Sequence, residues 1–254
     1  ERVIMAGPTP APLARAKGAF RHQIMMRSAS AKAMVEPLKQ VLRGFDLTVE
    51  DAQTMVIIGY SGTGKSVAIK HIVGLLVPDV GEVWVDGVHV ERLSRQDLYA
   101  LRGNIGYVFQ FCALFDSMSI EDNLRLGLAR RDLSEDEMHE RVEQSLRLVG
   151  LSGTEKQFPS ELSGGMRKRV GVARAIALRP RYILYDEPTT GLDPVTSAVI
   201  DQLMVRVREE LGTTAIVVTH DIRSAYTVGD RIAMLYEGRI RQVGTVQEIQ
   251  QTED

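Results

Sequence analysis

The chain has 254 residues, 44% of them hydrophobic and 25% charged, which is enough apolar material for one substantial α/β core. Its formal net charge of -2 argues against electrostatically driven binding to nucleic acid, so no nucleic-acid partner is expected. The single cysteine, Cys112, excludes an internal disulfide and indicates a reducing compartment.

Residues 1–22 are basic and rich in proline, with Glu1 as the one acid among them. Such a segment is expected to be a disordered tail or to reflect an uncertain start site, and a targeting peptide is the alternative interpretation. The remaining residues, 23–254, are expected to form one domain.

Strand-like apolar runs follow at residues 47–49, 55–58, 182–185 and 215–218, and helical patterns separate them. This alternation predicts a mostly parallel sheet with crossover helices. The runs have the length of core strands, and none approaches the ~20 apolar residues that cross a bilayer. Any link to a membrane is therefore expected to go through a partner.

Residues 82–90 alternate in polarity around Asp86-Gly87 and predict a hairpin. The region between residues 118 and 159 has helical pattern and no strong strand, so we expect a helical subdomain at about residues 113–165. Two amphipathic helices are predicted from apolar residues at helical spacing. The first carries Met138, Val142, Leu146 and Val149, and the second carries Val199, Leu203, Val207 and Leu211.

A glycine-rich turn stands between the strand at residues 55–58 and a helix predicted at residues 67–76. It fits the P-loop pattern, in which backbone N–H groups and a helix N-terminus bind phosphates. Lys65 is expected to contact the β- and γ-phosphates, and the Ser66 hydroxyl to ligate Mg²⁺. A chance turn is the alternative, and the pattern alone indicates any nucleoside triphosphate, as in kinases, GTPases and motors. The predicted binding residues are Gly59, Tyr60, Ser61, Gly62, Thr63, Gly64, Lys65, Ser66 and Val67.

The apolar strand at residues 182–185 ends in Asp186 and Glu187. Because the carboxyl ends of neighbouring parallel strands meet at one edge of a sheet, these acids are expected beside the phosphates. Asp186 is predicted to hold Mg²⁺, and Glu187 to be the base that polarises the attacking water. The alternative is that both acids cap the following segment, which the adjacent residues 188–193 disfavour.

A second anion-binding nest is predicted where Ser163, Gly164 and Gly165 open a basic helical stretch. With the phosphate loop and the acid pair in this order, the chain resembles the ABC ATPase family over residues 41–244. The resemblance implies a P-loop NTPase fold of the RecA-like type, with a mostly parallel sheet, an antiparallel β subdomain and a helical insertion. It also implies a homodimer, in which these three residues of one subunit close over the ATP on the phosphate loop of the other.

Three further residues match positions of that family. Gln110 matches the glutamine that senses Mg²⁺ and the attacking water, although an ordinary surface amide is the alternative. Asp193 matches the loop that crosses the dimer interface. His220, at the end of a core strand, matches the switch histidine that hydrogen-bonds the γ-phosphate. With Glu187 and Lys65, Gln110 and His220 complete the expected catalytic set.

The ring on which the family stacks adenine is missing from the expected place. It should precede residues 41–44 closely, but residues 32–37 contain no aromatic side chain. Met34 or Val35 would then pack against the base, or the segment is atypical. Tyr60 is a second departure, because a small residue or proline is commoner at that position.

Longer strings narrow the resemblance. Residues 62–67 (GTGKSV), 109–118 (FQFCALFDSM) and 159–169 (PSELSGGMRKR) are similar to the ATPases of Mla/Mce-type lipid transporters, including the chloroplast trigalactosyldiacylglycerol type. That resemblance implies two permease subunits, an Mce-domain lipid-binding protein, a possible small accessory subunit, and phospholipid or a related lipid as cargo. It implies a peripheral position on the cytoplasmic face of the inner, or plasma, membrane, with a plastid membrane as the alternative. Apolar residues past Gln110 fit either a docking surface for such a permease or packing of the helical subdomain: Phe111, Leu114, Phe115 and Met118.

Three rival functions remain open. An ABC importer for amino acids or ions has the same core and carries a different cargo. A non-transport ABC ATPase of DNA repair or translation is disfavoured, because the chain has one P-loop, one LSGG string and no long heptad run. A regulatory nucleotide sensor is disfavoured because Glu187 and His220 are both present.

Overall fold

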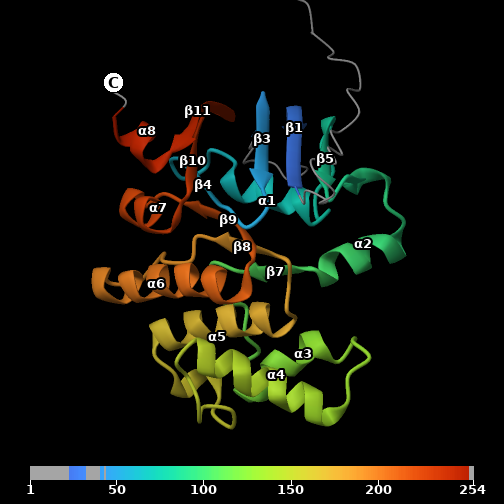
Figure 1. The fold of residues 1–254 in the computed structure, drawn as a ribbon, viewed down its shortest axis with the longest axis vertical. Coiled ribbons are helices and arrows are strands. Elements are labelled where there is room, and N and C mark those ends of the chain that lie inside the picture. The colour runs from blue at the N-terminus through green and yellow to red at the C-terminus, as the bar shows by residue number, and fades with distance from the viewer. Residues whose placement is uncertain (1–22, 33–40, 43, 252–254) are drawn as a thin grey trace, which may run out of the picture.

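The computed structural model describes residues 23–32, 41–42 and 44–251 (Figure 1). The predicted tail at residues 1–22 and most of the segment without an aromatic ring, residues 33–37, lie outside the described residues. In the described part of the chain, no helix combines the length and the apolarity that are needed to span a bilayer.

The main sheet has the strand order β11-β10-β4-β9-β8-β7. Its strands pair in parallel from β10 to β7, and β11 pairs antiparallel with β10, so the predicted mostly parallel sheet is confirmed. Each of the four predicted apolar runs lies in a strand. Three of the runs lie in this sheet, and the run at 47–49 lies in β3 of the second sheet. The strands of the main sheet are β4 (Thr54–Ile58), β7 (Ile105–Val108), β8 (Tyr182–Asp186), β9 (Thr214–Thr219), β10 (Arg231–Tyr236) and β11 (Arg239–Thr245).

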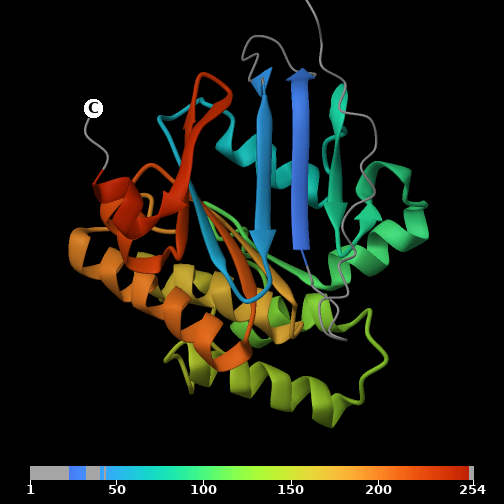
Figure 2. The same cartoon turned by 45° about the horizontal axis from the view of Figure 1, so that its top comes forward.

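A second sheet is antiparallel and stands beside the first, as Figure 2 shows. Its central strand is β1, which pairs with β3 and β5 and was not predicted from the sequence. The predicted hairpin at 82–90 is confirmed, because Asp86 and Gly87 both have positive φ, as a two-residue hairpin turn requires. The strands are β1 (Gln23–Lys32), β2 (Val41–Leu42), β3 (Phe45–Glu50), β5 (Val80–Val85) and β6 (Val88–His89).

Helices cover the main sheet. Between residues 113 and 165 the structure has α3, α4 and the short 3₁₀ helix η2, and no strand among these residues, although the bounds of a subdomain stay a prediction. The helices are α1 (Lys65–Ile72), η1 (Val90–Arg92), α2 (Arg95–Gly103), α3 (Ile120–Leu128), α4 (Glu135–Leu148), η2 (Pro159–Glu161), α5 (Gly164–Ala177), α6 (Pro194–Leu211), α7 (Ile222–Val228) and α8 (Val246–Gln250).

Two details of the predicted helices are wrong. Helix α1 ends at Ile72 and does not reach residue 76, because Gly74 adopts a positive φ that a helix cannot contain. On α6 the predicted face includes Val199 and Leu211, which are exposed. The buried face is turned by one residue and consists of Ile200, Leu203, Met204 and Val207, a spacing that keeps the period of 3.6.

The main sheet is buried on both faces. In β8, Ile183 and Tyr185 belong to one hydrophobic cluster and Tyr182 and Leu184 to the other. The first cluster packs against the helices α3 to α6, and the second against α1 and the antiparallel sheet (Figure 1). Strands covered in this way hold their carboxyl ends in fixed register, and those ends carry the candidate site.

Candidate functional site

The phosphate loop, residues 59–66, connects β4 to α1. Gly62 and Gly64 have φ values of +83° and +103°, which favour glycine at both positions. A Cβ on Gly59 would clash with the carbonyl oxygen of Leu235, so glycine is also required there for close approach of β10. The loop therefore reaches α1 with its backbone turned as a phosphate cradle requires, and Gly64 is the N-cap of the helix.

Lys65 is buried at the bottom of this loop, with 5% of its surface exposed. Its Nζ donates hydrogen bonds to the carbonyl oxygens of Gly59 and Tyr60, at 2.7 and 3.1 Å. It also lies 3.3 Å from Oε1 of Glu187. A buried ammonium is costly without partners, and these contacts hold it where the loop can present it to a phosphate.

Asp186 joins the acid strand to the phosphate loop and to β7. Ser66 Oγ donates to Asp186 Oδ1 at 2.7 Å, and the hydroxyl of Tyr107 donates to Oδ2 at 3.0 Å. Burial raises the pKa of Tyr107 strongly, and the nearby Asp186 carboxylate raises it further, so the phenol remains a donor at any physiological pH.

This donor set fits Mg²⁺. The Ser66 hydroxyl and the Asp186 carboxylate are hard oxygen ligands that converge on one point, and Mg²⁺ prefers a few such ligands beside phosphate oxygens and waters. The described residues contain no cluster of three or more His, Cys, Asp or Glu side chains that could form an all-protein cage. The two predicted ligands Ser66 and Asp186 are thus placed together, and Gln110 lines the same cavity as Ser66.

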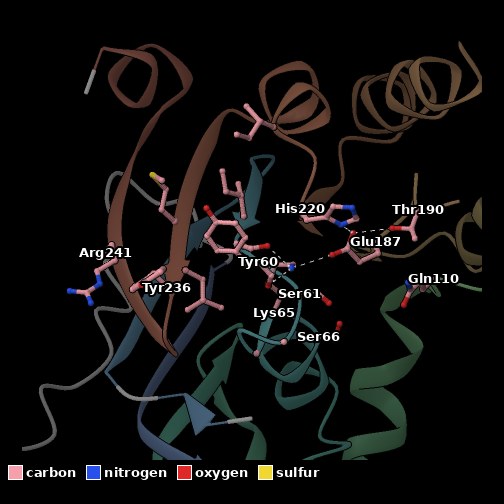
Figure 3. Close-up of a pocket in the computed structure, with 17 residues that line it drawn as sticks. Tyr60, Ser61, Lys65, Ser66, Gln110, Glu187, Thr190, His220, Tyr236 and Arg241 are labelled. Carbon is pink, nitrogen blue, oxygen red and sulfur yellow. Dashed lines mark hydrogen bonds and ion pairs between the residues drawn. The ribbon is translucent and has the colours of Figure 1, made fainter. Parts of the chain in front are cut away.

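Glu187 is held on both carboxylate oxygens. Its Oε1 faces Lys65, and its Oε2 lies 2.7 Å from Nδ1 of His220 and accepts a hydrogen bond from Thr190 Oγ1 at 3.1 Å. Glu187 also has a φ of +49°, a region that non-glycine residues occupy at a cost and that is often found at functional sites. Its backbone N–H donates to Val218 O, so β9 fixes this conformation. Figure 3 marks the side-chain contacts of Glu187 with Lys65, Thr190 and His220.

Gln110 follows β7 and is half-buried in the cavity wall. Its carbonyl oxygen accepts a 2.6 Å hydrogen bond from Nζ of Lys168, a buried residue of α5. Arg174, one turn and a half further along α5, donates to the carbonyl oxygens of Cys112 and Ala113. Since Cys112 and Ala113 both have positive φ, α5 holds the segment after Gln110 in an unusual backbone conformation.

A cavity of about 970 Å³ unites most of the predicted residues. One side of it is polar and belongs to the phosphate loop, Gln110 and the residues after β8 and β9. The other side belongs to the β10–β11 hairpin, which was not predicted to take part. The lining residues are Ile58, Gly59, Tyr60, Ser61, Gly62, Gly64, Lys65, Ser66, Gln110, Glu187, Thr190, His220, Ile222, Met234, Leu235, Tyr236 and Arg241.

Two residues predicted to bind the nucleotide, Thr63 and Val67, are not among the residues that line the cavity. Thr63 turns its hydroxyl to the carbonyl oxygen of Tyr60, at 2.9 Å. The side chain of Val67 is 7% exposed and packs in the hydrophobic cluster under α1, so its contribution to the loop is confined to the backbone.

The predicted dimer residues do not line the cavity within one chain, as far as the structure describes it. Ser163 caps α5 by accepting a hydrogen bond from the N–H of Met166, and Ser163 and Gly164 are exposed. Asp193 caps α6, and its hydrogen bonds to Thr196 lower the pKa of its carboxyl group. A Cβ on Gly165 would come within 2.5 Å of Thr196 Cγ2, so these two caps lie side by side at the protein surface.

Sequence reasoning missed several residues of the site. Tyr107, Thr190, Lys168 and Arg174 act through contacts with residues that are far away in the sequence, and no local pattern marks them. A weak indication existed for the β10–β11 hairpin, because Glu237-Gly238 is a turn signal between apolar runs.

A family model described as ABC transporter matches residues 42–190. A probable ribonucleotide transport ATP-binding protein, mkl, of Mycobacterium bovis is 43% identical over 199 residues, which are 78% of this chain and 55% of that protein. The methionine import ATP-binding protein MetN of Carboxydothermus hydrogenoformans is 39% identical over 216 residues, 84% of this chain and 64% of that protein. The chain thus spans between half and two thirds of the length of these relatives.

Solved structures give the same result for the fold. A dimeric post-hydrolysis state of the ATP-binding cassette MJ0796, bound to ADP and Pi, matches with a TM-score of 0.79 and 32% identity over 88% of this chain and 98% of that one. CbiO1 of Clostridium perfringens, part of the ABC transporter complex cbiONQ, matches with a TM-score of 0.81 and 30% identity over 90% of both chains. The α/β architecture with its P-loop is that of these cassettes, and the chain belongs to the ABC transporter family.

Proposed function

We propose that this chain binds ATP with Mg²⁺ and hydrolyses it as the ATP-binding subunit of a membrane ABC transporter. The observation that carries the proposal is the convergence of Lys65, Ser66, Asp186, Glu187 and His220 from three strand ends at one edge of the main sheet. Binding a triphosphate needs the cation and the backbone cradle, and hydrolysis needs a base beside them. The similarity to a cassette structure with bound ADP and Pi supports the same chemistry.

The present contacts of Glu187 suggest how the base is controlled. Lys65 lies 3.3 Å from Glu187, and a γ-phosphate in the loop would compete for the Lys65 ammonium. Loss of that contact would release one carboxylate oxygen to accept a proton from water, while His220 and Thr190 keep the other oxygen in place. Bound Mg²⁺, held by Ser66 and Asp186, would neutralise charge on the phosphate oxygens.

Two copies of the chain are proposed to share each nucleotide. Ser163 and Gly164 are exposed at the start of α5 and lie outside the cavity of their own chain, where a second copy can reach them. The N-terminus of α5 offers backbone N–H groups to an anion. Dimer closure on ATP and opening after hydrolysis would then be a population shift between two states.

The partners are proposed to be two permease subunits, which would hold the chain peripherally at the cytoplasmic face of a membrane. Phe111, directly after Gln110, and Phe115, four residues further on, are 84% and 55% exposed. Exposed aromatic side chains close to the cavity are suited to docking a partner. Phospholipid or a related lipid is the proposed cargo, with an Mce-domain protein and a small accessory subunit as further partners. The strings at 109–118 and 159–169 support this choice.

Import of a small cargo such as an amino acid is the second candidate, because the methionine importer of Carboxydothermus hydrogenoformans is 39% identical. Purification of the intact membrane complex through a tag on this chain separates the two candidates. Co-purification of an Mce-domain protein with bound phospholipid is the expected result. A complex that instead contains a binding protein for a free amino acid would overturn the lipid proposal.

Substitution Glu187→Gln tests the hydrolysis proposal. The amide keeps the shape of the side chain and cannot take the proton, so we expect ATP binding to persist and phosphate release to fall at least about a hundredfold. Phosphate release and equilibrium ATP binding are measured on the full chain, with Glu143→Gln, an exposed position on α4, as the matched control. Near-parental hydrolysis in Glu187→Gln would remove Glu187 as the base.

A further inference from the structure

The cavity has two chemically different ends. The phosphate end carries the glycines of the loop, Lys65 and Ser66, which suit a charged, polar group. The opposite end is formed by Met234 and Tyr236 of β10, with Tyr60 of the loop beside them (Figure 3), and all three are exposed large hydrophobic side chains. A ligand with a triphosphate at one end and a flat apolar group at the other fits this division.

Two tyrosines line this end of the cavity, and both follow the paired stretch of β4 and β10. Strands β4 and β10 pair in parallel up to Ile58 and Met234. Tyr60, in the phosphate loop, and Tyr236, at the end of β10, each follow these residues by two positions, and both line the cavity. The close approach of Gly59 to the carbonyl of Leu235 shows that the two segments are still in contact beyond the last paired residues.

Tyr236 is held firmly at this edge. It is the last residue of β10, and a two-residue turn with positive φ at Glu237 and Gly238 leads into β11. The guanidinium carbon of Arg241 lies 5.4 Å from the centre of its ring, a cation–π contact. In Figure 3, Tyr236 lies between Arg241 and Tyr60 on the side of the cavity opposite Glu187. The ring is nevertheless 45% exposed, so its surface is open to a ligand.

We propose that Tyr236, supported by Arg241 and flanked by Tyr60 and Met234, is the surface on which the base of the nucleotide stacks. The inference rests on the proposed binding of ATP at the phosphate loop. It supplies an aromatic ring for the base in a chain that has no aromatic side chain at residues 32–37.

The experiment compares ADP with inorganic pyrophosphate, which has the same two phosphates and no base. Dissociation constants are measured by calorimetry in the presence of Mg²⁺ on the full chain and on Tyr236→Ala, Tyr236→Phe and Tyr99→Ala. Tyr99 is an exposed tyrosine of α2 outside the cavity and serves as the matched control. Tyr236→Ala is expected to raise the dissociation constant of ADP about 5- to 30-fold and to leave that of pyrophosphate within about twofold. Tyr236→Phe and Tyr99→Ala should behave as the parent.

Arg241→Met is the second variant and leaves the tyrosine in place. It is expected to weaken ADP about two- to fourfold, because the ring loses its cation, without changing the affinity for pyrophosphate. Equal weakening of both ligands in the Tyr236 and Arg241 variants would place these residues at the phosphates and overturn the inference, as would unchanged ADP binding in Tyr236→Ala. If the parent chain binds neither ligand, the proposed function itself fails, and this inference with it.

Discussion

Tyr107 shows how a single hydroxyl can orient Asp186, the proposed magnesium ligand. The hydroxyl donates to the oxygen of Asp186 that Ser66 does not contact, so the carboxylate is fixed from two strands and one helix. Its ring also lies 4.4 Å from that of Phe109, which leads directly into Gln110. The side chain of Tyr107 therefore connects β8 with the segment that leads to Gln110, so a displacement of one would shift the other.

Substitution Tyr107→Phe removes this hydroxyl and little else. We expect the Mg²⁺ concentration for half-maximal ATP hydrolysis to rise about fivefold, since a hydrogen bond that orients a charged ligand is worth roughly 1 kcal/mol or more. A magnesium titration of phosphate release measures it, with Tyr99→Phe as the control. An unchanged or lower magnesium requirement would mean that Asp186 does not depend on Tyr107 for its orientation.

Asp201 is a buried acid outside the site. Burial raises its pKa to about 6, although the hydrogen bond from Ser224 favours the charged form. Its Oδ1 has no hydrogen-bond partner among the described residues. Because the folded pKa lies above the unfolded value, the folded state binds the extra proton between about pH 4 and pH 6, and stability is lost as the pH rises through this interval.

Substitution Asp201→Asn should therefore stabilise the protein in a pH-dependent manner. The amide resembles the neutral acid, so the gain is expected to be roughly 1–3 kcal/mol above pH 7 and to vanish near pH 4. Chemical unfolding of the parent and the variant across this range measures the difference. A gain that is the same at both pH values would show that ionisation of Asp201 carries no penalty.

Helix α5 connects two parts of the proposed machine. It begins at the residues that are proposed to face the second copy, and Lys168 in its second turn holds the carbonyl of Gln110. Burial lowers the pKa of Lys168, while the nearby Glu187 raises it. A rigid helix that joins the dimer surface to the cavity wall can transmit displacement from one to the other.

Loss of the Lys168 contact should slow turnover more than it weakens binding. In Lys168→Met the carbonyl of Gln110 loses its charged donor. Of the two α5 cations, only Arg174 then still contacts the segment with positive φ at Cys112 and Ala113. We expect kcat to fall about three- to tenfold, or about 1 kcal/mol in the barrier, with KM for ATP within about twofold. The control is Lys156→Met at an exposed position. A rise in KM for ATP without a fall in kcat would contradict this role.

Local patterns were sufficient for the elements that lie within one stretch of chain. The phosphate loop, the acid strand and the 82–90 hairpin each carry their information in ten residues or fewer, and each has the predicted conformation. Strand β1 was missed, because it is the centre of a sheet whose pairing partners are distant in the sequence. The hydrogen bonds of Tyr107 and Lys168 span 79 and 58 residues, and no periodicity encodes them.

At the scale of the whole molecule, the two halves of the proposed active site do not meet. The cavity holds the phosphate loop and the base, and the caps of α5 and α6 stand at another part of the surface. A single chain could thus bind a nucleotide in its cavity, but the predicted anion nest at the start of α5 does not face that cavity. A symmetric dimer would solve this, because the same two surfaces of each copy then face each other.

Mixing two inactive variants tests this arrangement directly. Lys65→Ala damages the phosphate loop, and Gly164→Trp blocks the nest that is offered to the other copy. A mixed dimer has one site with both defects and one site with none, so the mixture should recover phosphate release while each variant alone remains inactive. Random pairing of equal amounts gives roughly a quarter of intact sites, which sets the upper limit of the recovery. The control is a third variant that carries Lys65→Ala and Gly164→Trp in the same chain. Mixed with either single variant, it should not raise phosphate release above that of the single variant alone. If Gly164→Trp alone hydrolyses ATP at the parental rate, or if the mixture stays inactive although mixed dimers form, the shared site is excluded.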